Sequence, residues 1–180
     1  AAALANLGTA KQVASRFMNV FLPENPASYT SEDLTILSFI TETLQGTRAN
    51  GTFINGRAPY LGGGCERFDT SCHSELLKGN MKPQSSVVRA GLIIKSCDLV
   101  TDKNTAISNA LAKVNRTLSS PVEAQAVAEL YELFTPGSNL PSYIRDPLVT
   151  SGSGAAGFNS TERWRFILNF LCTFQGWEGL

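Results

Sequence analysis

The residues best suited to chemistry lie close together, in the segment from Cys65 to His73. Two cysteines followed directly by a histidine form the residue set that attaches haem covalently, with the thiols bonded to the vinyl groups and the imidazole bound to iron. Met81, eight residues further on, is a candidate for the opposite axial position. The usual attachment motif has two residues between its cysteines, whereas six separate Cys65 from Cys72. Haem binding is therefore the alternative interpretation, and a local disulfide between Cys65 and Cys72 is the favoured one.

Other metal or hydrolytic chemistry has little support in the residue pattern. A structural zinc site would have to recruit Cys65, Cys72, His73 and Cys97, but the chain has no Cys-x-x-Cys pair. A serine or cysteine hydrolase would depend on His73, because the sequence contains one histidine. No serine lies in a Gly-x-Ser-x-Gly turn. We therefore expect a protein that is not an enzyme and that has neither a metal nor a cofactor.

The cysteines indicate a compartment as well as a covalent framework. Cys97 and Cys172 each fall on the apolar side of a hydrophobic predicted helix, which suits a buried disulfide between helices. Four cysteines allow three pairings, and we favour Cys65 with Cys72 and Cys97 with Cys172. Disulfides persist in oxidising compartments, so we expect an exported chain, periplasmic or extracellular. The small residues at positions 1–3 resemble the remainder of a signal-peptidase site.

The charge of the chain is balanced and low. Among 180 residues, Lys and Arg together number 15, as do Asp and Glu, and the charged fraction is 17%. Soluble domains average about 25%. The sequence has no stripe of basic residues of the kind that binds nucleic acid. It also has no apolar run that reaches the roughly 18 residues of a membrane-spanning helix. A surface with so few charges repels its neighbours weakly, so we expect a protein partner or a second copy of the chain to cover part of it.

Apolar residues recur at helical spacing over most of the chain, which predicts an all-α fold. Residues 30–33 form a capping start, Ser120 is a second expected cap, and Asn159 or Ser160 is expected to cap the last helix. Pro147 is expected to limit residues 141–150 to one helical turn. We predict a single domain over residues 1–180, a compact bundle of about five or six helices. The side chains expected in its core are Leu92, Ile93, Leu130, Phe134, Trp164, Ile167 and Leu171.

One long loop, residues 47–83, interrupts this helical pattern and contains two of the cysteines. A loop of this length inside a domain is usually functional or cross-linked, and a disulfide within it would reduce the entropy that it loses on docking. Its apolar side chains either cap the core or bind a partner. The partner-binding candidates are Phe53, Ile54, Tyr60, Leu61 and Phe68 in the loop, together with Trp177 near the end of the chain.

A second candidate contact is the run of alternating cations and aromatics from Arg163 to Phe166. It is either a core tryptophan flanked by arginines that extend to solvent, or an Arg/aromatic anchor for a partner. These patterns together favour a non-catalytic binding or structural subunit of a periplasmic or extracellular assembly. A haem-binding electron-transfer protein that uses Cys65, Cys72 and His73 is the alternative, and a small-ligand carrier is a third class.

Overall fold

The computed structural model describes residues 10–45, 87–154 and 157–174, and each regular element in these ranges is helical. The α-helices are α1 (Ala10–Phe21), α2 (Ser31–Ile40), α5 (Val87–Thr101), α6 (Asn104–Lys113), α7 (Ala124–Phe134), α8 (Ser142–Gly154) and α9 (Ser160–Thr173). A 3-10 turn, η1 (Pro26–Ser28), precedes α2, and a π-helical stretch, η2 (Thr41–Gln45), continues it. The all-α prediction is confirmed, but five or six helices was too few: these ranges alone contain seven.

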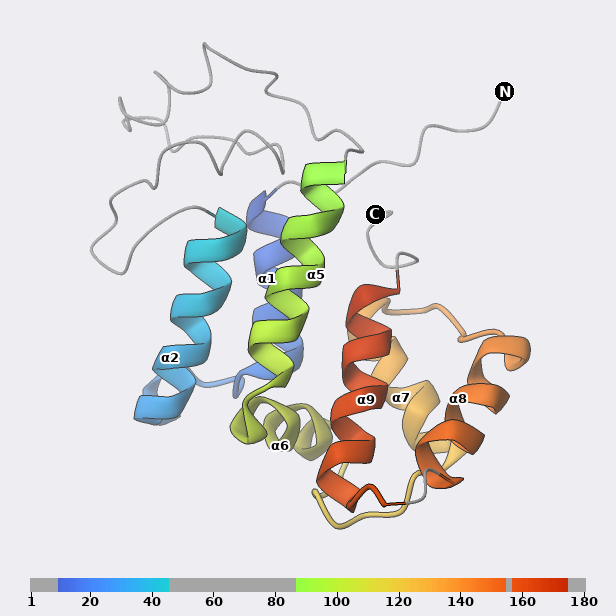
Figure 1. The fold of residues 1–180 in the computed structure, drawn as a ribbon. Coiled ribbons are helices and arrows are strands. Elements are labelled where there is room, and N and C mark those ends of the chain that lie inside the picture. The colour runs from blue at the N-terminus through green and yellow to red at the C-terminus, as the bar shows by residue number, and fades with distance from the viewer. Residues whose placement is uncertain (1–9, 46–86, 155–156, 175–180) are drawn as a thin grey trace, which may run out of the picture.

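The described helices form two groups that share a boundary (Figure 1). Helices α1, α2 and α5 lie side by side, and α6 crosses one end of them. Helices α7, α8 and α9 pack together as the second group, which joins the first through contacts of α5 and α6 with α9 and of α1 with α7. Helix α5 is central to this arrangement, since it contacts α2, α6 and α9. None of the described helices is long and apolar enough to cross a membrane.

A continuous apolar core runs through both groups. Its largest side chains are Trp164, Phe17, Phe21 and Phe134, all fully buried. Phe21 of α1 meets Phe134 of α7 edge-on, with 5.8 Å between the ring centroids, which is a favourable geometry for an aromatic pair. Six of the seven side chains predicted for the core are buried, and the seventh, Leu92, is partly buried against it.

Two helices begin where the sequence predicts, and for the predicted reason. The Thr30 hydroxyl accepts a hydrogen bond from the backbone N–H of Asp33, whose carboxylate accepts one from the backbone N–H of Thr30. Asn159 and Glu162 make the same reciprocal pair at the start of α9. Each capping box satisfies N–H groups that have no partner inside the helix, which fixes the direction in which α2 and α9 enter the bundle.

The expected cap at Ser120 was wrong. Helix α7 begins at Ala124 with Glu123 as its N-cap, three residues later than predicted. The carbonyl of Ser120 instead accepts hydrogen bonds from the indole N–H of Trp164 (2.9 Å) and from the hydroxyl of Ser160 (3.3 Å). The buried indole needs an acceptor, and this long-range requirement outweighs the local capping preference.

The expected break at Pro147 was also wrong. Helix α8 runs from Ser142 to Gly154 with Pro147 inside it, and this helix accounts for the excess over the predicted number. Proline removes one helical N–H and leaves the carbonyl of Tyr143, four residues earlier, without its usual donor. Tyr143 is highly exposed, and Leu148 beside the proline is buried in the core. Packing of that leucine therefore holds the helix together at a position where solvent reaches the backbone.

Candidate functional site

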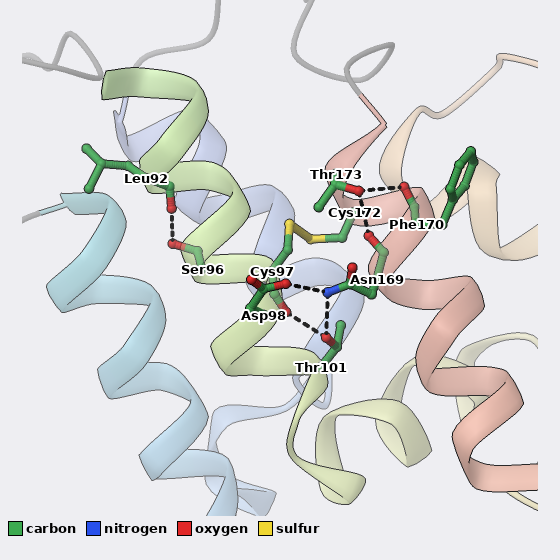
Figure 2. Close-up of a disulfide and its surroundings, with 9 residues drawn as sticks. All are labelled: Leu92, Ser96, Cys97, Asp98, Thr101, Asn169, Phe170, Cys172 and Thr173. Carbon is green, nitrogen blue, oxygen red and sulfur yellow. Dashed lines mark hydrogen bonds between the residues drawn. A yellow bond between two sulfur atoms is a disulfide. The ribbon is translucent and has the colours of Figure 1, made fainter. Parts of the chain in front are cut away.

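A disulfide joins the two groups of helices at their boundary. Cys97 of α5 and Cys172 of α9 are bonded, both fully buried, with 5.8 Å between their Cα atoms and 75 positions between them in the sequence (Figure 2). This is the pairing that the sequence favours. Because the bond closes so long a loop, it removes many conformations from the unfolded chain, an effect that the loop-entropy model puts at about 4.5 kcal/mol.

One helical turn from the disulfide, a polar bridge repeats the connection between α5 and α9 (Figure 2). The side-chain amide of Asn169 donates to the Asp98 carboxylate (2.9 Å) and to the Thr101 hydroxyl (3.1 Å). The Thr101 hydroxyl in turn donates to the carbonyl of Cys97 at 2.7 Å. The amide position is therefore fixed by the same two helices that the disulfide links.

Arg165, one turn further toward the start of α9, makes the next connection. Its Nε–H donates to the carbonyl of Thr101 at 3.0 Å, and its guanidinium also donates to the Asn104 side-chain oxygen. Both acceptors are uncharged, so the positive charge of Arg165 lies at the C-terminal end of α5, where it satisfies a backbone carbonyl rather than neutralising a carboxylate. Together the disulfide, Asn169 and Arg165 form a seam, here called the α5–α9 seam.

A groove of about 420 Å³ opens over this seam to solvent. Its lining comes from the end of α5, the first two-thirds of α9 and the residue that precedes the α9 cap. The lining residues are Asp98, Thr101, Asp102, Phe158, Glu162, Arg165, Phe166 and Asn169. We take the α5–α9 groove as the candidate functional site because its floor is already ordered by the seam.

Two aromatic rings line this groove while remaining half exposed: Phe158 is 54% exposed and Phe166 is 51% exposed. Phe158 directly precedes the cap of α9, where an apolar residue normally packs against the fourth helical position. That position holds Arg163, so Phe158 has no apolar partner of this kind. Phe166 lies off the buried face of α9, which contains Trp164 and Ile167. The local sequence therefore leaves both rings at the surface.

The charges of the groove are unbalanced. Asp98, Asp102 and Glu162 contribute three carboxylates, and Arg165 is the only cation among the residues that line the groove. No salt bridge joins Arg165 to these carboxylates. The neighbouring cation, Lys103, has its ammonium 5.7 Å from the centre of the Phe39 ring on α2 and so is engaged elsewhere. The groove thus combines apolar rings with excess negative charge.

A second polar cluster, the Asp33–Asn109 junction, links α1, α2 and α6. The side-chain amide of Asn109 donates to the Asp33 carboxylate (2.7 Å) and to the carbonyl of Phe21 (3.0 Å). Burial by itself would raise the pKa of Asp33, but hydrogen bonds from the backbone N–H of Thr30, the Asn109 amide and the Thr30 hydroxyl outweigh it and lower that pKa. The buried carboxylate is charged and fully satisfied inside the protein.

A smaller hollow of about 250 Å³ lies beside α1 and α6. Its cation, Lys113, donates to the carbonyl of Asn19, and Glu24 lies in the same lining. Burial lowers the pKa of Lys113, partly offset by the negative charge of Glu24. One cation and one anion balance each other here, in contrast to the α5–α9 groove.

Most residues that the sequence marks as candidates lie outside the described ranges. These are Cys65, Cys72, His73 and Met81, the partner-binding candidates Phe53, Ile54, Tyr60, Leu61 and Phe68 in loop 47–83, and Trp177. The Cys65–Cys72 disulfide and the haem interpretation therefore stay predictions. Of the residues for which a bond was predicted, the structure brings together Cys97 and Cys172. The run from Arg163 to Phe166 divides: Trp164 is core, whereas Arg165 and Phe166 line the groove.

Sequence reasoning missed the polar residues that connect the helices, Asn109 and Asn169, and the exposure of Phe158. The lack of an apolar residue at the fourth position of α9 was the one available signal for Phe158. Within residues 10–45, 87–154 and 157–174, no group of three or more Cys, His, Asp or Glu side chains is placed to hold a metal ion. Comparisons with protein-family models, curated proteins and solved structures find no match to this chain.

Proposed function

We propose that this chain is a non-catalytic binding subunit of an exported protein assembly, and that the α5–α9 groove makes the contact with its partner. The observation that carries the proposal is the pair of half-exposed phenylalanines, Phe158 and Phe166, over a floor fixed by a disulfide and hydrogen bonds. An ordered groove floor favours binding, because the protein loses little further conformational entropy when a partner binds. Aromatic side chains in such a setting are the usual anchors of protein interfaces.

The groups in the groove support binding rather than catalysis. The Thr101 hydroxyl donates to the Cys97 carbonyl, and the Asp98 carboxylate accepts from Asn169. Activating a hydroxyl nucleophile needs a general base that accepts its proton, whereas the Thr101 hydroxyl is directed at a backbone carbonyl and not at a carboxylate of the groove. The Cys97–Cys172 bond is compatible with the oxidising compartment that the sequence predicts, which supports placement of the assembly in the periplasm or outside the cell.

Site-specific photo-crosslinking tests the proposal. A photoreactive phenylalanine analogue at position 166 should crosslink one protein in the native source, and excess unlabelled chain should abolish the product. The matched control is the same analogue at Tyr143 on α8, which is 77% exposed but outside the groove. Binding of the purified partner should then weaken in Phe166→Ala and persist in Tyr143→Ala. Equal crosslinking from both positions, or none from position 166, would contradict the proposal.

An absorption spectrum tests the haem alternative directly. A haem held by Cys65, Cys72 and His73 would give an intense Soret band in the native protein. We expect no such band from the protein purified without reductant. A Soret band that disappears in His73→Ala would replace the binding proposal with the electron-transfer one.

A further inference from the structure

The charge of the α5–α9 groove specifies the chemistry of its partner. Three carboxylates and one guanidinium line it, and the guanidinium of Arg165 is bonded to two uncharged oxygens. The Asp98 and Glu162 carboxylates each accept an amide hydrogen bond, from Asn169 and from the backbone of Asn159. Among the described residues, none forms a hydrogen bond or an ion pair with the side chain of Asp102, which is exposed. The lining therefore has acceptor capacity and negative charge that the protein does not itself use.

The aromatic rings add a requirement that an inorganic cation would not meet. A ring face attracts an ammonium or guanidinium group through its quadrupole, and its apolar surface covers the methylene stem of a lysine or arginine. Phe158 and Phe166 lie on the same groove as the carboxylates, so a basic side chain there can contact both kinds of group. An acidic peptide or a nucleic-acid phosphate would meet like charge at Asp98, Asp102 and Glu162.

We infer that the α5–α9 groove binds a basic segment of a different protein, in which lysine or arginine alternates with apolar residues. The cationic groups lie against the carboxylates of Asp98, Asp102 and Glu162, and the apolar residues contact Phe158 and Phe166. The inference rests on the proposed function, since it specifies the partner of the same site. Charge complementarity carries it: apolar rings alone would not distinguish a basic partner from a neutral one.

The test is an NMR titration of the isotope-labelled full chain with a designed probe, the peptide acetyl-Leu-Arg-Leu-Lys-Leu-amide. The matched probe has glutamate in place of both basic residues. We expect the basic peptide to shift the side-chain amide of Asn169 and the Nε–H of Arg165 in a saturable way, and the acidic peptide to leave both unchanged. Added salt should weaken the basic peptide, because the carboxylates are near the surface and are screened.

Variants assign the effect to the groove. Asp102→Asn and Phe166→Ala should each weaken binding of the basic peptide by about fivefold, the size of one partly exposed charge or cation–aromatic contact. The controls, Glu132→Gln on α7 and Tyr143→Ala on α8, remove a charge and a ring outside the groove and should change affinity less than about twofold. All four positions are exposed, so circular dichroism should show an unchanged fold.

Three results of the peptide titrations would overturn the inference. The first is equal binding of the acidic peptide, and the second is unchanged affinity in both groove variants. The third is a set of groove shifts that grows with protein concentration without any peptide, which would assign the groove to self-association. A crosslinked partner that binds Asp102→Asn as tightly as wild type, but binds Phe166→Ala more weakly, would also overturn it while leaving the proposed function intact. If no partner exists, the photoreactive analogue at position 166 gives no crosslinked product, and that result contradicts the proposed function.

Discussion

The α5–α9 seam and the Asp33–Asn109 junction both tie together helices that are distant in the sequence, and both use an asparagine amide to do so. At the junction, Asn109 donates to a carboxylate that is buried and already holds two hydrogen bonds from Thr30. At the seam, Asn169 donates to a carboxylate at the surface, beside two others in the groove. Asn109 therefore completes a polar cluster that is buried from solvent, which we call closed. Asn169 belongs to a cluster that solvent still reaches, which we call open.

This difference in solvent access distinguishes a structural polar cluster from a candidate binding site. A buried charge is costly unless hydrogen bonds satisfy it, and the Asp33 carboxylate meets that condition inside the protein. The carboxylates of the groove meet it only partly within the protein and otherwise through solvent, so a partner can replace the water. The covalent bond allows this arrangement, because the Cys97–Cys172 link holds α5 to α9 without requiring the groove to be filled.

Removing the disulfide should affect stability most. The double variant Cys97→Ala/Cys172→Ala should lower the free energy of unfolding by about 4.5 kcal/mol, because the unfolded chain regains the entropy of a long open loop. Urea denaturation of the two proteins measures the difference. As a control, a thiol assay on denatured, unreduced wild type should find no free thiol. A loss below about 1 kcal/mol would mean that packing, rather than the covalent bond, holds the α5–α9 seam.

The next effect concerns the core that the seam and the junction share. Leu130 of α7 is fully buried, so Leu130→Ala should lower the free energy of unfolding by about 2–5 kcal/mol through lost apolar contact and a residual cavity. The matched control is Leu34→Ala on α2, where the side chain is 55% exposed and the change should stay within about 0.5 kcal/mol. Thermal or urea unfolding of both variants checks the pair. Similar losses in the two would place Leu130 at the edge of the core.

The features of the seam and of the junction that depend on neighbouring residues could be predicted from the sequence. The helix starts at Thr30 and Asn159 follow from capping residues within one turn, and the Cys97–Cys172 bond follows from two cysteines on apolar helix faces. Such features need only the residues next to them, so a single chain reveals them. Most of the predicted core follows in the same way, from apolar spacing along each helix.

The long-range contacts that determine whether a polar cluster is buried or reached by solvent could not be predicted in this way. The role of Asn109 depends on α1 and α2, which are 88 and 76 positions away, respectively, at the contacting residues. Likewise, the buried indole of Trp164 recruits Ser120, and the buried Leu148 keeps α8 helical through Pro147. Each of these outcomes depends on which helix lies opposite, and tertiary contacts of this kind override local propensity.

The two asparagines give a direct comparison of the clusters. Asn109→Ala should lower the free energy of unfolding by about 1–3 kcal/mol, because it removes a donor from the buried Asp33 carboxylate and from the carbonyl of Phe21. Asn169→Ala should cost less, about 1 kcal/mol, because water can replace its amide at the exposed Asp98 and the buried Thr101 hydroxyl keeps its hydrogen bond to the Cys97 carbonyl. Urea denaturation of both variants under one set of conditions gives the difference. Equal losses would remove the distinction between a closed junction and an open seam.

The smallest effect is the pH dependence of the junction. The pKa of Asp33 in the folded protein lies below the usual value of 3.8, because hydrogen bonds from Thr30 and Asn109 outweigh burial. A lowered folded pKa means that the unfolded state binds the proton first, so this group stabilises the fold fully above that usual value. Its contribution is lost as the pH falls through the lowered folded pKa.

Urea denaturation of wild type and Asp33→Asn, from about pH 7 down to about pH 2, should therefore show a difference in the free energy of unfolding that narrows only in the acid range. The Asp146→Asn control removes an exposed carboxylate that pairs with Arg145 on α8, and it should change the free energy of unfolding by less than about 1 kcal/mol. A wild-type advantage over Asp33→Asn that stays constant down to about pH 2 would contradict the assignment of a charged, hydrogen-bonded Asp33 to the junction.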